Sequence, residues 1–291
     1  MRHLLAADRV RFGGRRDIWL LVALLPVVLA LMFVAEFNGV VTPPQNEFFI
    51  TDPPDPEFEA QMREQMLAEW RQQLTTSLPA FAFPASLAKV ASNFGPMVLL
   101  AIYFATALVA GEFEWGTVRT VHLTSSRWRT LAVRVAVVVG LVAVATAVGL
   151  ILAAIIPFFL TAEGRPLQDY AAPVADLWGT IASRLLIVLP FIAIPVLMAV
   201  LTGSTGLAFL LTLLLLIADG AVTGAPLWAA SPVPWVPALT LTGSITRLLS
   251  GPESPLSTVA PGWISIAALI AWAIVPIGAA IVRFRRVDIN E

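Results

Sequence analysis

Long apolar runs separated by shorter polar segments dominate the chain. Six of them reach or approach the roughly 20 residues that an α-helix needs to cross about 30 Å of hydrocarbon. They cover residues 18–35, 90–111, 131–160, 179–202, 204–222 and 262–282. The pattern predicts one all-α integral membrane domain over residues 1–291 with six transmembrane helices. The fourth and fifth runs meet at Gly203, and so short a connection predicts a tight helical hairpin.

Residues 1–17 mix five arginines with apolar side chains, which predicts a basic amphipathic helix lying on the membrane surface. A basic start before an apolar run is also typical of a signal peptide. Here the basic region is long and further spans follow, so we expect the segment to be retained.

Two polar or broken segments are too long to be turns. Residues 36–89 begin Pro-rich and acidic, and then apolar side chains recur at every fourth position after Pro56: Phe58, Met62, Met66, Trp70 and Leu74. This spacing predicts an amphipathic outer helix over 56–78, which packs on the bundle, lies on the membrane or contacts substrate. Residues 223–261 are apolar but rich in proline, so they predict a cap or re-entrant element at the outer face.

Arginine is distributed unevenly between the two sides of a six-span topology. Most of the 18 basic residues fall in or beside 1–17, 112–130 and 283–291, all on the side of the termini. Because basic residues concentrate in cytoplasmic loops, this asymmetry predicts cytosolic termini and a multi-pass protein of the bacterial cytoplasmic (inner) membrane.

Composition excludes several kinds of site. The chain has no cysteine and only two histidines, which removes disulfides, thiolate ligands and a His-rich metal site. A net charge of -1 gives no support for a nucleic-acid partner. The only lysine, Lys89, lies between Ala88 and Val90, so no Walker A sequence is possible. We therefore expect no cofactor on this chain, and any ATP hydrolysis must come from a partner.

The connection between the second and third spans carries an unusual density of charge. Residues 112–123 form a short, helix-capable segment held between two membrane helices on the cytosolic side. Such a segment can transmit a push from a soluble partner into the bundle. An ordinary positive-inside loop is the alternative interpretation.

The same segment resembles the permease subunits of type-2 ATP-binding-cassette exporters. In that family an acidic residue closes the second span, followed by Gly-Thr, a nearby Arg, and a Ser-Arg pair leading into the third span. The matching residues here are Glu114, Gly116, Thr117, Arg119, Ser126 and Arg127. Where members often have Gly or Pro before the Ser-Arg pair, this chain has Thr124-Ser125.

The resemblance implies a coupling helix around 112–123 that docks into a groove of a separate nucleotide-binding ATPase, which would hold ATP and Mg. Glu112, Glu114 and Arg119 are the candidates for the docking face. The family works as two permeases, identical or homologous, with two ATPases. Alternating access is driven by closure of the ATPases, and membrane lipids surround the permeases.

Two ionisable residues lie inside the predicted spans, Arg184 in the fourth and Asp219 in the fifth. A charge inside the membrane usually has a partner. Counted from the turn at Gly203, the two differ in depth by only about 4–5 Å, which predicts an intramembrane charge pair.

Proton coupling through Asp219 is the alternative to that pair, and it would make the protein a stand-alone proton-coupled secondary transporter. A membrane-embedded enzyme lacks an acid–base pair or a metal site in the spans. An accessory or signalling protein is the last alternative.

Overall fold

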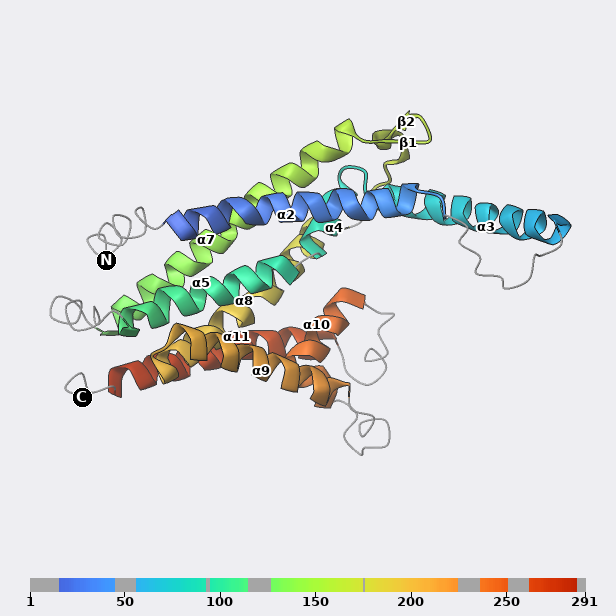
Figure 1. Cartoon of the computed structure of the whole chain (residues 1–291). Helices are drawn as coiled ribbons and strands as arrows, with labels where there is room; N and C mark the ends of the chain where they lie inside the picture. Colours follow the sequence, from blue (N-terminus) through green and yellow to red (C-terminus); the bar gives the residue numbers. More distant parts are fainter. Residues whose placement is uncertain are drawn as a thin grey trace. The chain divides into compact units, whose positions relative to one another are not determined.

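The computed structural model describes residues 16–44, 56–92, 95–114, 127–174, 176–224, 236–250 and 262–286, and the description below concerns these ranges. They are almost entirely helical (Figure 1). The α-helices are α2 (Arg16–Val41), α3 (Pro56–Ser77), α4 (Ala85–Ser92), α5 (Gly95–Glu114), α7 (Arg127–Ile155), α8 (Leu177–Thr202), α9 (Thr205–Thr223), α10 (Leu241–Ser250) and α11 (Gly262–Arg286). Four short 3-10 helices are η1 (Leu78–Ala80), η2 (Ile156–Phe159), η3 (Leu167–Tyr170) and η5 (Val236–Leu239). One antiparallel hairpin joins β1 (Thr161–Ala162) to β2 (Arg165–Pro166).

Five helical segments in these ranges are long and apolar enough to cross a membrane. They are Trp19–Val41, Arg129–Phe159, Leu177–Thr202, Thr205–Thr223 and Gly262–Arg285. Counting α4 and α5 together as one broken span makes six. Many of their large apolar side chains, such as Leu207, Ile217 and Val275, are exposed, as the lipid-facing surface of a membrane protein requires. The chain is therefore a mostly helical protein with five or six candidate membrane spans.

The observed helix bounds depart from the apolar runs where proline or a polar residue intervenes. The first run ends at residue 35, but α2 continues through Glu36 to Val41. The second run covers 90–111, whereas the structure has α4 and a new helix, α5, in whose first turn Pro96 lies. Proline is tolerated there because its missing N–H has no partner inside the helix. The third run ends as a 3-10 helix at Pro157.

The described residues group into two compact units. Unit 1 comprises Met1–Leu25, Phe94–Thr146 and Ala182–Glu291, and unit 2 comprises Pro26–Asn93 and Ala147–Ile181. Helices α2, α7 and α8 contribute residues to both units.

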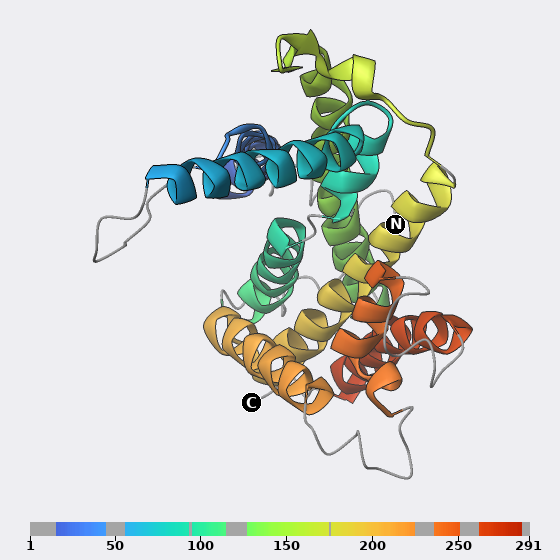
Figure 2. The ribbon, with the colours of Figure 1, turned by 90° about the vertical axis from the view of Figure 1, so that its right-hand side faces the viewer.

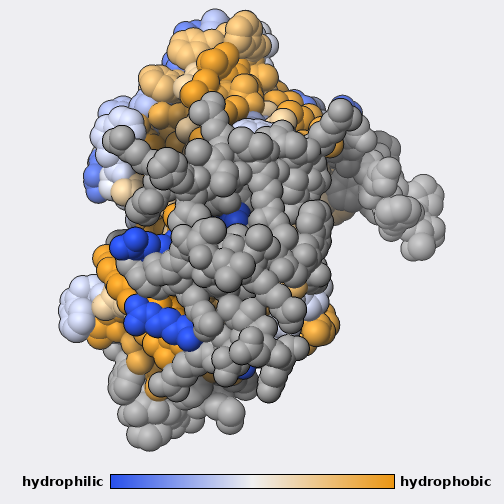
Figure 3. Space-filling view, turned by 90° about the vertical axis from the view of Figure 1, so that its left-hand side faces the viewer, coloured by the Kyte–Doolittle hydropathy of each residue, from blue (hydrophilic) through white to orange (hydrophobic). Residues whose placement is uncertain are grey.

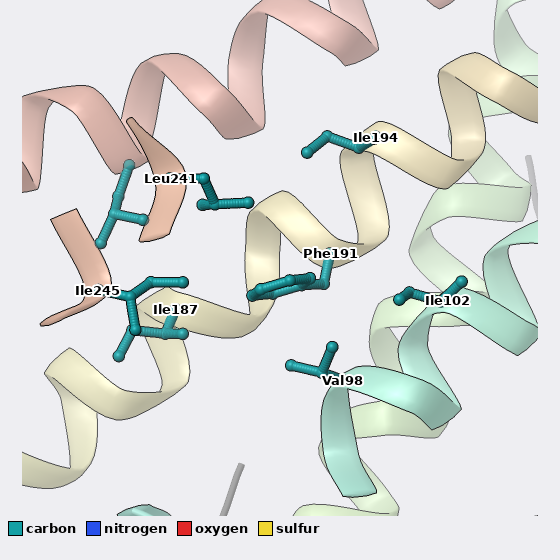
Figure 4. Close-up of a cluster of buried hydrophobic side chains, with 8 residues drawn as sticks. Val98, Ile102, Ile187, Phe191, Ile194, Leu241 and Ile245 are labelled. Atoms are coloured by element: carbon teal, nitrogen blue, oxygen red, sulfur yellow. The ribbon is translucent and has the colours of Figure 1, made fainter. Parts of the chain in front are cut away.

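Unit 1 is built around a buried apolar cluster that four helices share. Figure 4 shows its side chains converging from α5, α8 and α10. The buried members are Val98, Ile102, Ile187, Phe191, Ile194, Leu241, Ile245 and Leu269. Around this cluster α10 lies between α9 and α11 (Figure 2), and α5 packs along α9. Close van der Waals packing of these side chains holds the short α10 against the longer helices.

Unit 2 joins the C-terminal part of α2 to α3, η1 and α4. The Phe81 ring lies 5.4 Å from Phe33 and 5.7 Å from Phe37, edge to face. Above the same ring, the Lys89 ammonium lies 4.3 Å from the ring centroid and 2.8 Å from a Glu36 carboxylate oxygen. Helix α3 begins at Pro56 and ends before Pro79, as the four-residue spacing predicts. Its N-terminal end extends away from the rest of unit 2 (Figure 1).

Candidate functional site

The expected coupling segment lies between two helix ends of unit 1. Helix α5 ends at Glu114 and α7 begins at Arg127, so Glu112 and Glu114 close one helix and Arg127 opens the next. The side chains of these three residues lie outside the described part of the chain. The other predicted site residues, Gly116, Thr117, Arg119 and Ser126, lie outside it altogether.

Phe113, between the two glutamates, is described and fixes what surrounds the start of the segment. Its ring packs edge to face against Phe284 near the end of α11, with the centroids 5.7 Å apart. Gly203, which forms the α8–α9 turn with a φ of 62°, also lies beside Phe113. A Cβ atom added at Gly203 would come within 3.5 Å of the Phe113 Cβ. The coupling segment therefore leaves α5 where the α8–α9 turn and the end of α11 meet it.

This end of unit 1 also carries arginines on the helices that finish or begin there. Arg129 on α7 and Arg283 and Arg285 on α11 are exposed. Figure 3 looks onto this end and shows strongly hydrophilic patches set among apolar surface. One further arginine, Arg134, is buried on α7, further inside the helix. The distribution is typical of helix ends at a membrane–water boundary.

Arg184 and Asp219 lie away from that end, and both contact α10. The Asp219 carboxylate accepts hydrogen bonds from the backbone N–H groups of Leu241 (3.0 Å) and Thr242 (2.7 Å), in the first turn of α10. The Arg184 guanidinium donates hydrogen bonds to the backbone carbonyls of Leu248 (3.2 Å) and Leu249 (3.3 Å), in its last turn.

No direct ion pair joins Arg184 to Asp219 among the described residues; the two side chains bind opposite ends of α10 instead. The first N–H groups and the last carbonyls of a helix have no partner inside it. They also carry the partial positive and negative charges of the helix dipole, so a carboxylate and a guanidinium are each placed at the favourable end. The similar depth of the two charges stays a prediction, and the ten-residue helix between them was not predicted from the sequence. We call this arrangement the α10 clamp.

Three more contacts hold the α10 region, and sequence reasoning did not identify their residues. The Thr240 hydroxyl accepts a hydrogen bond from Gly243 N–H (3.0 Å), which makes it the N-cap of α10, and it lies 2.6 Å from the Thr223 hydroxyl of α9. The indole N–H of Trp272 on α11 donates to the Leu239 carbonyl (3.0 Å). A threonine directly ahead of a helix-capable stretch was the available signal for the cap.

Gly243 has a steric role of its own. A Cβ atom added there would overlap the Pro237 carbonyl. The absence of a side chain therefore lets η5 fold back onto the first turn of α10.

Within the described ranges, no group of three or more His, Cys, Asp or Glu residues is arranged to hold a metal ion.

Comparison with known proteins places this helical architecture in a family. The model of the ABC-2 family transporter proteins matches residues 8–289. No curated protein and no solved structure matches the chain. The match includes both the connection between α5 and α7 and the Arg184–α10–Asp219 region. With nearly its whole length covered and five or six helices able to cross a membrane, the chain belongs to the ABC-2 family of transporter proteins.

Proposed function

We propose that this chain is the permease subunit of an ATP-driven exporter of the bacterial inner membrane, with both termini in the cytosol. The family match over residues 8–289 carries the proposal, because the membrane subunits of such transporters depend on a nucleotide-binding partner. The chain contains no Walker A sequence, so ATP and Mg are assigned to a separate ATPase. Two permeases, identical or homologous, assemble with two ATPases.

Residues 112–123 are the proposed docking site for the ATPase. Helix α5 of unit 1 ends within this segment, α7 begins shortly after it at Arg127, and Phe113 packs against the α8–α9 turn and α11. A force applied to the segment therefore reaches three further helices directly. Glu112, Glu114 and Arg119 provide charges for the docking face, Gly116 and Thr117 lie in the same segment, and Ser126 and Arg127 follow it and lead into α7.

Asp219 gives little support to the alternative of a stand-alone proton-coupled carrier. Both of its carboxylate oxygens accept hydrogen bonds from backbone N–H groups of α10. A carboxylate that must release and take up protons during transport would have to break these contacts in every cycle.

Charge reversal in the docking segment tests the proposal. Glu114→Lys should prevent an ATPase from co-purifying with the tagged permease after mild detergent extraction, while the permease itself still inserts and purifies. The matched control is Glu163→Lys, the same reversal at an exposed position in the β1–β2 turn, which should leave co-purification unchanged. If no ATPase co-purifies with the wild-type chain, the exporter assignment fails and the carrier alternative gains support.

A further inference from the structure

We propose that Asp219 and Arg184 are positioning residues that hold α10 closed over the apolar cluster of unit 1, and that release of α10 is a step of the transport cycle. The second half of this statement rests on the proposed function. The first half rests only on contacts within unit 1.

Helix α10 depends on its neighbours for its structure. It has ten residues, and isolated helices shorter than about 12–15 residues are marginal in water. Its first free N–H groups are bonded by Asp219 and its last free carbonyls by Arg184. Both ends are therefore completed by side chains of other helices, α9 and α8.

The side of α10 that faces the unit covers apolar side chains. Leu241 and Ile245 are buried in the cluster with Ile187 and Phe191 of α8 and Leu269 of α11 (Figure 4). On the opposite side of α10, Thr246 is exposed. Displacement of α10 would open this cluster, and the clamp is one of the contacts that keep it covered.

The helices that hold α10 also reach the expected coupling segment. Helix α9 starts at the turn beside Phe113 and carries Asp219 near its other end. Helix α11 contacts Phe113 through Phe284 and contacts η5 through Trp272. A shift of α5 at Phe113 therefore acts on two of the helices that hold α10 and η5. Because Arg184 lies on α8 and Asp219 on α9, movement of α9 relative to α8 would strain the clamp.

Cysteine labelling tests the clamp, because the native chain has no cysteine. Ile245→Cys places a thiol on the buried side of α10, where the native side chain is only 8% exposed. The rate at which a membrane-impermeant maleimide labels this thiol is measured in three proteins. One carries only Ile245→Cys, and the other two carry Asp219→Asn or Arg184→Met in addition. Loss of one favourable charge at a helix end should raise the labelling rate about tenfold. Asp219→Glu and Arg184→Lys keep the charge and should keep the rate low.

Two controls separate release of α10 from general loosening. Val138→Cys places the thiol at a fully buried position of α7 outside the cluster, and its labelling should stay low in every background. Thr212→Val removes a buried hydroxyl of α9 that bonds only its own helix, at Ala208, and should leave the Ile245→Cys thiol protected. Equal labelling of the Ile245→Cys thiol with and without the clamp would overturn the proposal. A parallel rise at both reporter positions would also overturn it, because the clamp would then be an ordinary stabilising contact.

The role in the cycle is tested in the co-purified complex with an intact clamp. Addition of Mg-ATP with vanadate should raise labelling of the Ile245→Cys reporter about tenfold while the Val138→Cys reporter stays protected. If ATP leaves the labelling rate of the Ile245→Cys reporter unchanged, release of α10 is no part of the cycle, although the exporter assignment stands on the co-purified ATPase. If no ATPase co-purifies, the assignment itself fails, and the Asp219 and Arg184 variants still decide whether the clamp holds α10.

Discussion

At the scale of single residues, two charged side chains provide hydrogen-bond partners for the backbone groups at the ends of a short helix. A buried charge is costly unless it is paired or fully hydrogen-bonded. Arg184 and Asp219 are half-buried, and backbone groups of α10 provide their hydrogen bonds, although the Arg184 Nε atom has no partner within the described residues. Their presence in apolar helices could be predicted from the sequence. Their hydrogen-bond partners could not be predicted, because the partial charges at helix ends come from backbone groups and not from charged residues.

Exchange of the two charges distinguishes the clamp from an ion pair. In the double variant Arg184→Asp with Asp219→Arg, a direct pair would be restored with reversed polarity. In the clamp, each new charge meets the end of α10 that repels it. We expect the double variant to be less stable than Arg184→Met or Asp219→Asn alone, each of which costs about 1–2 kcal/mol. The melting temperature of the purified protein in detergent is the measurement, and recovery towards the wild-type value in the exchanged variant would contradict the clamp.

Gly243 offers a second prediction at this scale. Gly243→Ala should lower stability by about 1–3 kcal/mol, because the new methyl group overlaps the Pro237 carbonyl and the backbone must move. Gly278→Ala is the matched control, since no atom lies within 4 Å of a Cβ added at this position of α11. There the better helix propensity of alanine should leave stability equal or raise it by up to about 1 kcal/mol. The same thermal measurement compares both, and equal effects would argue against the steric role of Gly243.

At the scale of elements, hydrophobic periodicity predicted the helices well and their interruptions less well. The runs at 179–202, 204–222 and 262–282 agree with α8, α9 and α11 to within a few residues, because each is almost entirely apolar and Gly203 or Gly262 marks one of its ends. The run at 90–111 concealed the change from α4 to α5. Hydropathy alone does not register where proline ends one helix and begins another.

Hydrophobic periodicity did not predict α10, for a different reason. It is too short to span a membrane and lies in a Pro-rich stretch. The sequence therefore predicted only a cap or re-entrant element over 223–261. Its contacts with α8, α9 and α11 are tertiary, between residues tens of positions apart, and no local pattern records them.

Helix α3 is attached to α2 through one hydrogen bond that can be removed by itself. The Trp70 indole N–H donates to the Val40 carbonyl (3.0 Å), beside the buried Leu74. Trp70→Phe keeps an aromatic ring but loses the donor, at a cost of about 1 kcal/mol. We expect trypsin to cleave the purified variant faster at the exposed Arg63 and Arg71 of α3.

The control for α3 is Phe58→Leu, an apolar exchange at an exposed position near the other end of the helix. Its digestion rate should equal that of the wild type. Should Trp70→Phe digest no faster than this control, the bond to Val40 contributes nothing to the attachment of α3, and Leu74 with its neighbours must account for it.

At the scale of the whole molecule, family membership was predictable from one short motif and the layout of the spans. The family match over 8–289 confirms the resemblance. The docking face could not be defined further, since the side chains of all its predicted residues lie outside the described part of the chain. What the structure adds there is Phe113, an apolar residue that no charge or motif singled out.

The arginine asymmetry also predicts the orientation of the whole chain in the membrane, with both termini in the cytosol. Single cysteines at Asp8, Glu114 and Asn290 should resist an impermeant thiol reagent in intact cells, whereas a cysteine at Glu59 in α3 should react. Permeabilised cells, in which all four should label, provide the control.

The structure makes part of this test independent of the charge argument, because Phe113 contacts Phe284 and brings the ends of α5 and α11 together. Glu114 and Asn290 should therefore behave alike whichever side they occupy. Labelling of both from outside would reverse the orientation and leave the fold intact, whereas labelling of only one would contradict the packing of unit 1.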